Sequence, residues 1–152
     1  MASAKLIEKT EDLGRVAEMV ASAEVIGLDI ETYNVTTLKG EFDPLVGAIR
    51  LIQLNVDDRE GGLFVVDVKK AGNIDPLVQA FRDTNAVFVI HNAKFEQKWF
   101  KHHFDFEFDK LFCTFRAEAV LTNGKGLPLD LWSVSDRYLG THPDVPDMGG
   151  TA

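Results

Sequence analysis

The chain has 152 residues, of which 24 are acidic and 16 are basic, so its net charge at neutral pH is −8. This length is enough for one domain with a substantial core. An acidic chain does not carry the broad basic surface that grips duplex nucleic acid by counterion release, although an enzyme that holds one strand end through metal ions in a local cleft needs no such surface.

The cysteine content and the apolar runs indicate the compartment. The single cysteine, Cys113, cannot form an internal disulfide, and no Cys/His cluster has zinc-ligand spacing. No targeting segment is recognisable, and no apolar run approaches the roughly 20 residues that span a bilayer. We therefore expect a soluble, cytoplasmic protein that has no membrane partner.

The first half of the chain predicts one helix followed by an antiparallel meander. Thr10 is placed to cap a helix that ends near Ala23, because apolar residues recur there at helical spacing. Three extended segments follow at 25–31, 48–56 and 63–68, with glycines marking the turns. Sequential strands with short connections favour antiparallel pairing.

The second half alternates between helix and strand. A short helix fits 76–81, and the apolar run 86–90 predicts a strand that is buried on both faces. Asn92 is placed to cap a helix that continues to about His103. The remaining predicted elements are a brief strand at 111–114 and helices at 115–122 and 129–139. A meander followed by crossovers predicts an α/β fold of the ribonuclease H type, with a mixed β-sheet flanked by helices.

Two carboxylates stand two residues apart at the end of the first apolar strand. Side chains at i and i+2 of a strand point to the same face, so Asp29 and Glu31 should project side by side. Adjacent anions repel each other, and a cation would offset that cost. Their oxygen ligands suit Mg2+ or Mn2+. The alternative interpretation is a strand that runs into a solvated acidic loop.

A second polar pair follows the strand predicted at 86–90, where open α/β sheets usually place their ligand crevice. Asn92 and Glu96 are four residues apart, so a helix capped by Asn92 would carry Glu96 one turn further on nearly the same face. That helix would aim the Glu96 carboxylate toward the strand pair. The alternative is an ordinary N-cap followed by a solvated glutamate.

Four segments of the chain form an ordered set of motifs: Asp29 to Thr32, Ile49 to Leu54, His91 to Glu96, and Leu127 to Gly140. Together they resemble the 3'-5' exonucleases of the four-carboxylate (DEDD) superfamily. The resemblance is greatest to the proofreading domains of bacterial polymerase I-like enzymes and to ribonuclease D. Because four motifs occur in the right order at plausible spacing, the resemblance is far more specific than any one of them.

The resemblance implies hydrolysis of terminal phosphodiesters in single-stranded DNA or RNA by two divalent metal ions, Mg2+ or Mn2+. Asp29 would bridge both ions, Glu31 would hold the ion that activates the attacking water, and Glu96 would support the second ion, largely through water. The backbone around Thr32 would lie near the terminal sugar, and Asn92 would steady the strand end. The resemblance to proofreading domains also makes a polymerase, or another replication or repair protein, a candidate partner.

The chain departs from the family pattern at several places, two of which concern the metal-binding carboxylates. The family usually has Asp where this chain has Glu96, and the extra methylene moves the carboxylate by roughly 1.5 Å. The family also carries a fourth carboxylate on a later helix, in a motif Tyr-x-x-x-Asp or His-x-x-x-x-Asp. Tyr138 has His142 at the fourth position, and the prolines between His142 and Asp147 disfavour a helix. We expect residues 1–142 to form the exonuclease-like domain and 143–152 to be a disordered or truncated tail.

Two other hypotheses remain open at the sequence level. The missing fourth carboxylate favours a catalytically impaired or truncated exonuclease fold that binds nucleic acid or a protein partner. The second hypothesis is another ribonuclease H-like phosphotransfer enzyme, such as a resolvase or transposase core. The predicted helix from Asn92 to Glu96 argues against this second hypothesis. The sequence does not identify the sugar type or the oligomeric state.

Overall fold

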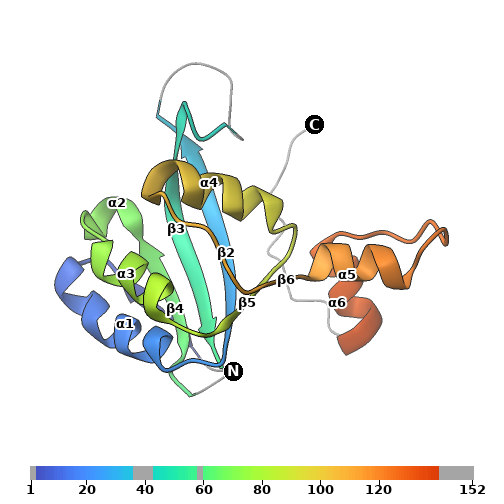
Figure 1. The fold of residues 1–152 in the computed structure, drawn as a ribbon, viewed down its shortest axis with the longest axis horizontal. Coiled ribbons are helices and arrows are strands. Elements are labelled where there is room, and N and C mark those ends of the chain that lie inside the picture. Colours follow the sequence, from blue (N-terminus) through green and yellow to red (C-terminus); the bar gives the residue numbers. More distant parts are fainter. Residues whose placement is uncertain (1–2, 36–42, 58–59, 141–152) are drawn as a thin grey trace. The chain divides into compact units, whose positions relative to one another are not determined.

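The computed structural model describes residues 3–35, 43–57 and 60–140 (Figure 1). The chain divides into two compact units, Met1–Cys113 and Thr114–Ala152, and each is described by itself. None of the helices in the described ranges is long and apolar enough to cross a membrane. The expected tail at 143–152 lies outside the described residues, as do His142 and Asp147.

The first unit is built on a mixed sheet, which within the described residues has six strands in the order β1-β4-β3-β2-β5-β6. The strands are β1 (Lys5–Ile7), β2 (Val25–Asn34), β3 (Gly47–Val56), β4 (Leu63–Asp67), β5 (Val87–Ile90) and β6 (Leu111–Cys113). β2, β3 and β4 form an antiparallel meander, whereas β1 joins β4, and β5 joins β2 and β6, in parallel. The predicted mixed sheet is confirmed. The sequence pattern does not predict β1, because three residues are too short to show a periodicity.

Helices of the first unit pack on one face of this sheet (Figure 1). They are α1 (Leu13–Ala21), which follows a 3-10 turn at Thr10–Asp12, α2 (Val68–Ala71), α3 (Asp75–Asp83) and α4 (Lys94–Phe104). The prediction that Thr10 caps the first helix is wrong. Its hydroxyl donates instead to the carbonyl of Ala71 at 2.6 Å and to that of Asn73 at 3.0 Å, because the 3-10 turn carries it away from α1 and toward the end of α2.

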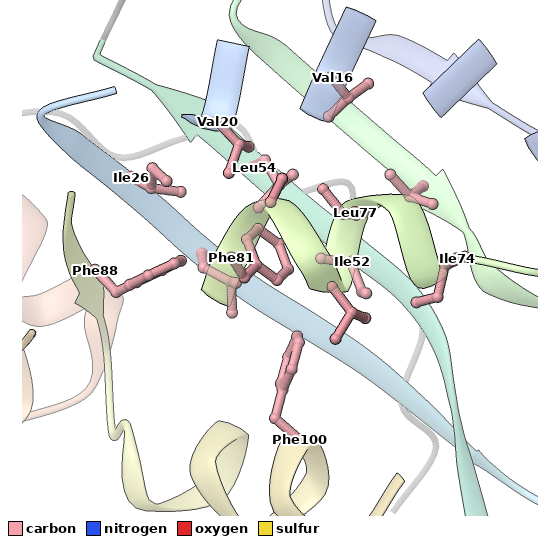
Figure 2. Close-up of a cluster of buried hydrophobic side chains, with 14 of the residues drawn as sticks. Val16, Val20, Ile26, Ile52, Leu54, Ile74, Leu77, Phe81, Phe88 and Phe100 are labelled. Carbon is pink, nitrogen blue, oxygen red and sulfur yellow. The ribbon is translucent and has the colours of Figure 1, made fainter. Parts of the chain in front are cut away.

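The core lies between this helical layer and the sheet (Figure 2). On β2 and β3 the buried residues alternate and face each other in pairs, Leu28 with Leu54 and Ile30 with Ile52. Each such side chain contributes about 1.5–3 kcal/mol when it is fully buried. Since a shift of one residue would turn these side chains to the opposite face, the core fixes the register of the two strands that carry the acidic motif.

Strand β5 has the predicted position but not the predicted burial. Phe88 and Ile90 are buried, whereas Val87 keeps 37% of its surface exposed. The expectation of burial on both faces is therefore wrong, because the helices of the first unit cover only the face to which Phe88 and Ile90 point. The brief strand predicted next to it is confirmed as β6, which pairs with β5 in parallel.

The second unit contains the two helices predicted near the end of the chain, α5 (Thr114–Leu121) and α6 (Leu131–Leu139). Asp130 caps α6 by accepting from the backbone N–H of Ser133 at 2.9 Å. The buried carboxylate of Glu118 on α5 forms an ion pair with Arg137 on α6. Arg137 also donates to the carbonyl of Pro128 at 2.9 Å, so one guanidinium group ties the two helices and the intervening loop together.

Candidate active site

The strand pair Asp29 and Glu31 lies on β2 as the alternation predicts. Both side chains are exposed, and they alternate with the buried Leu28 and Ile30. Glu31 lies opposite Leu51 of the neighbouring strand. The two carboxylates therefore share one side of β2 because the core holds the intervening residues on the other side.

A β-bulge follows the acidic motif directly. Glu31 pairs with Leu51 and Thr32 with Ile49, so Arg50 is an extra residue on β3. The Arg50 side chain forms an ion pair with the buried Asp67 at the end of β4. The predicted substrate residue Thr32 is half-buried beside this bulge. The sequence gives no signal for the bulge, because no glycine marks it.

Asp29 lies between side chains of two neighbouring strands. On one side, Nε2 of Gln53 donates to Oδ2 of Asp29 over 3.3 Å. On the other side, His91 follows β5 closely enough to act on Asp29 electrostatically. The pKa of Asp29 is nevertheless raised above its ordinary value, mainly because nearby protein shields the carboxyl group from part of the solvent, while the backbone N–H of Ile30 and then His91 oppose that shift.

Glu96 is the buried carboxylate of the site. It stands in the first turn of α4 and is only 3% exposed. Burial raises its pKa to about 7, its own backbone N–H opposes this, and the negative charge of Asp29 raises it further. Its Oε2 is buried and has no hydrogen-bond partner among the residues that the structure describes. Helix α4 thus carries the Glu96 carboxylate toward Asp29 of the strand, as predicted. The alternative of a solvated glutamate is wrong.

Asn92 does not cap α4 through its side chain, so that prediction is wrong. The helix begins at Lys94, and the residue before it, Ala93, makes no side-chain cap bond. Asn92 instead adopts a left-handed conformation with a φ of 61°, and its carbonyl accepts from the N–H of Phe95 at 2.9 Å. A capping residue needs an extended backbone, whereas Asn is one of the few residues that tolerate the left-handed turn found here. The turn leaves the Asn92 side chain exposed beside the site.

The site therefore contains two interacting carboxylates, Asp29 and Glu96, with Glu31 on the same side of the strand as Asp29. In residues 3–35, 43–57 and 60–140, no group of three or more His, Cys, Asp or Glu side chains is arranged so that it could hold a metal ion. The two interacting carboxylates still fit a divalent cation. A cation would satisfy the unpartnered Oε2 of Glu96, and oxygen donors suit Mg2+ or Mn2+.

Comparison with known proteins agrees with this geometry. A family model described as 3'-5' exonuclease matches residues 4–148. The chain belongs to the 3'-5' exonuclease family. A comparison with curated proteins gives no match.

Solved structures of DEDD-superfamily exonucleases share the fold of this family member. The catalytic core of RRP6 from Trypanosoma brucei is 20% identical with a TM-score of 0.76, and the match covers 99% of this chain and 39% of that one. Escherichia coli RNase D is 22% identical with a TM-score of 0.70 and coverages of 93% and 35%. Brucella melitensis NrnC with bound Mg2+ is 20% identical with a TM-score of 0.66, and the match covers 84% of this chain and 59% of that one. Brucella melitensis NrnC bound to pGG is 17% identical with a TM-score of 0.70 and coverages of 95% and 65%. The chain thus spans less than two thirds of each of these proteins.

Proposed function

We propose that this chain hydrolyses the terminal phosphodiester at the 3' end of single-stranded nucleic acid, with Mg2+ or Mn2+ as cofactor. The observation that carries the proposal is the buried Glu96, whose unpartnered oxygen and raised pKa accompany a second carboxylate, Asp29, on strand β2. A purely structural role does not explain why a helix should bring a buried carboxylate toward another one, because the two repel each other.

Five residues would bind the metal ions and the end of the substrate strand. Asp29, Glu31 and Glu96 would hold two divalent ions once Glu31 comes closer to the other two carboxylates than it lies in this structure. The ions when bound would activate water and stabilise the charge that develops on the phosphate. The low polarity around Glu96 strengthens its attraction for a cation. The backbone at Thr32 and the exposed amide of Asn92 would hold the strand end, and the bulge and the left-handed turn fix where these two residues lie.

The structural neighbours support the choice of cofactor and substrate. NrnC was solved with Mg2+ and with pGG, and the E. coli RNase D is described as an exoribonuclease involved in structured RNA processing. We therefore propose single-stranded nucleic acid as the substrate class, and the experiment below compares DNA with RNA. A polymerase, or another replication or repair protein, is the partner that we propose from the resemblance to proofreading domains.

The test is the stepwise shortening of 5'-labelled single-stranded DNA and RNA, with Mg2+, with Mn2+ and with chelator. We expect metal-dependent release of mononucleotides, which Asp29→Ala should abolish. The wild-type protein is the standard against which the folding of the variant is judged. Cleavage that survives chelation, or that survives Asp29→Ala, would contradict the proposal. The preferred sugar follows from the relative rates on the two substrates.

A second candidate is a catalytically impaired member of the family that binds nucleic acid or a protein partner. The observation that favours it is the sequence after Tyr138, which departs from the motif that carries the fourth carboxylate. It predicts that the protein binds Mn2+ and single-stranded nucleic acid without shortening the strand. Measuring metal binding and cleavage on the same preparation therefore separates the two candidates.

A further inference from the structure

We infer that Gln53 is a positioning residue that holds the Asp29 carboxylate ready for a divalent cation. This inference rests on the proposed function and adds a residue that is not itself a carboxylate to the site. It starts from one contact, in which Nε2 of Gln53 donates to Oδ2 of Asp29 over 3.3 Å.

The position of Gln53 is fixed by the sheet. It lies on β3 directly opposite Asp29 on β2, and directly opposite residues of an antiparallel pair have Cβ atoms about 4.5–5.5 Å apart. The pairs Leu28 with Leu54 and Ile30 with Ile52 flank it on the buried side. Because a one-residue slip of either strand would bury its polar side chain and expose its core residues, the Gln53 amide stays next to Asp29.

The chemistry of an amide suits this position. A carboxylate offers about four lone-pair positions, and one N–H···O bond occupies only one of them. Gln53 is neutral, so it orients Asp29 without cancelling the charge that attracts a cation, whereas a lysine or arginine would compete with the ion. Holding the carboxylate in one rotamer also removes part of the conformational entropy that metal binding would otherwise cost.

Gln79 provides a matched control within the same chain. It is also a glutamine whose Nε2 donates to an aspartate, Asp83, at 2.9 Å, but it lies on the exposed side of α3. Replacing either glutamine by leucine removes the same donor and keeps a similar volume. Only Gln53→Leu should therefore affect the site, while both variants should unfold at temperatures close to that of the wild-type protein.

Two measurements test the inference. In metal-free protein, the side-chain amide resonances of Gln53 in a 15N-correlated NMR spectrum should move to values typical of a solvated glutamine in Asp29→Ala, while those of Gln79 stay in place. In the presence of Mn2+, the dissociation constant measured by electron paramagnetic resonance should rise about tenfold in Gln53→Leu and stay unchanged in Gln79→Leu.

The outcomes separate this inference from the proposed function. If Asp29→Ala abolishes Mn2+ binding but Gln53→Leu binds as well as the wild-type protein, the positioning role is wrong and the proposed function stands. Mn2+ binding that Asp29→Ala leaves unchanged overturns both. Gln53 resonances that do not respond to Asp29→Ala also overturn the positioning role, because the hydrogen bond would then be absent in solution.

Discussion

Replacing Glu96 by glutamine should make the metal-free protein more stable at alkaline pH. The folded protein raises the pKa of Glu96 from 4.5 to about 7, so it binds this proton more tightly than the unfolded chain does. Stability is therefore greatest below pH 4.5, falls as the pH rises toward 7, and is then constant with respect to this group. A glutamine has no proton to lose, so it is not subject to this fall.

The size of the effect follows from the two pKa values. A pKa of about 7 against 4.5 corresponds to about 3 kcal/mol, which is an upper value because relaxation around the charged carboxylate reduces it. We expect the stability of Glu96→Gln relative to the wild-type protein to increase by up to about 3 kcal/mol between pH 4.5 and pH 8. Urea unfolding in the presence of chelator, followed by circular dichroism, measures this difference.

A second buried glutamate provides the control. Glu118 is as deeply buried as Glu96 but forms an ion pair with Arg137, so Glu118→Gln should destabilise the protein rather than stabilise it at pH 8. Adding Mg2+ or Mn2+ should stabilise the wild-type protein at pH 8 more than Glu96→Gln, because the ion replaces the missing partner. A stability difference between Glu96→Gln and the wild-type protein that does not change with pH would refute the reasoning.

Further predictions concern packing and the left-handed turn. A methyl group at Gly47 would lie 2.6 Å from the Trp99 ring, so Gly47→Ala should lower the free energy of unfolding, measured in urea, by about 1–3 kcal/mol. In helix α1 a methyl group at Gly14 would meet no atom within 4 Å, so Gly14→Ala should raise the free energy of unfolding by about 0.5–1 kcal/mol. Equal effects of the two changes would contradict the packing. Asn92→Gly should keep the stability but weaken binding of a 3' end in a fluorescence anisotropy assay, while Asn92→Ala should also cost about 1 kcal/mol in unfolding because its φ of 61° strains alanine. Unchanged binding by Asn92→Gly would exclude a role for the amide.

The parts of the fold that follow from hydrophobic periodicity were predictable. The meander, the crossover strands and the longer helices of both units follow from their apolar spacings, whereas β1 and α2 are too short to show a periodicity. The same alternation places Asp29 and Glu31 on one side of β2. The approach of Glu96 to Asp29 was also accessible, because a helix that follows a neighbouring parallel strand begins at the same edge of the sheet.

Other features depend on contacts that no local pattern reveals. The capping role expected for Asn92 failed because Asn suits both a helix cap and a left-handed turn, and the backbone decides between them. Gln53 looks like any polar residue of an alternating strand until the register with β2 is known. Sequence alone does not give that register, because the alternation within each strand does not show which residues of β2 and β3 lie opposite each other.

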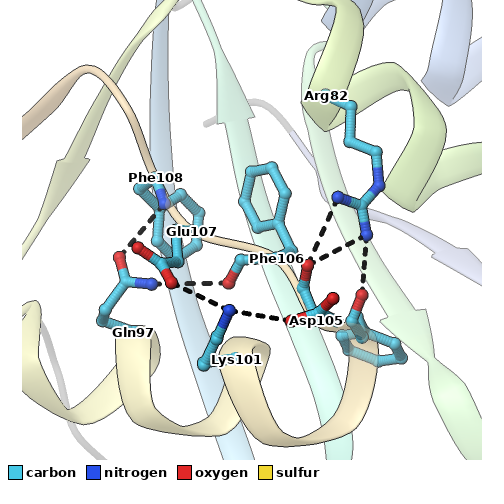
Figure 3. A network of polar contacts seen from close by, with 8 residues as sticks. Arg82, Gln97, Lys101, Asp105, Phe106, Glu107 and Phe108 are labelled. Carbon is cyan, nitrogen blue, oxygen red and sulfur yellow. Dashed lines mark hydrogen bonds and ion pairs between the residues drawn. The ribbon is translucent and has the colours of Figure 1, made fainter.

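The network around Arg82 shows how the end of α4 is held far along the helix from Glu96 (Figure 3). Arg82 of α3 donates to the carbonyls of Phe104 and Asp105, while Lys101 pairs with Asp105 and Glu107. Gln97, one residue after Glu96, accepts from the N–H of Phe108 at 3.1 Å. These contacts fasten α4 at several points, so the helix that carries Glu96 has little freedom to rotate about its axis.

The extra residue Arg50 shifts the inside–outside alternation along β3 by one position in the sequence. Gly47 and Ile49 are buried before it, whereas Ile52, Leu54 and Val56 are buried after it. Arg50 is the one residue between Gly47 and Val56 that has no register partner on β2. Its deletion would therefore leave Ile49 next to Leu51 in regular alternation, with Gly47 and Ile49 still on the buried side, and would remove the ion pair with Asp67. This position is where the β2–β3 ribbon can change in length by one residue while the segment that carries Asp29 keeps its geometry.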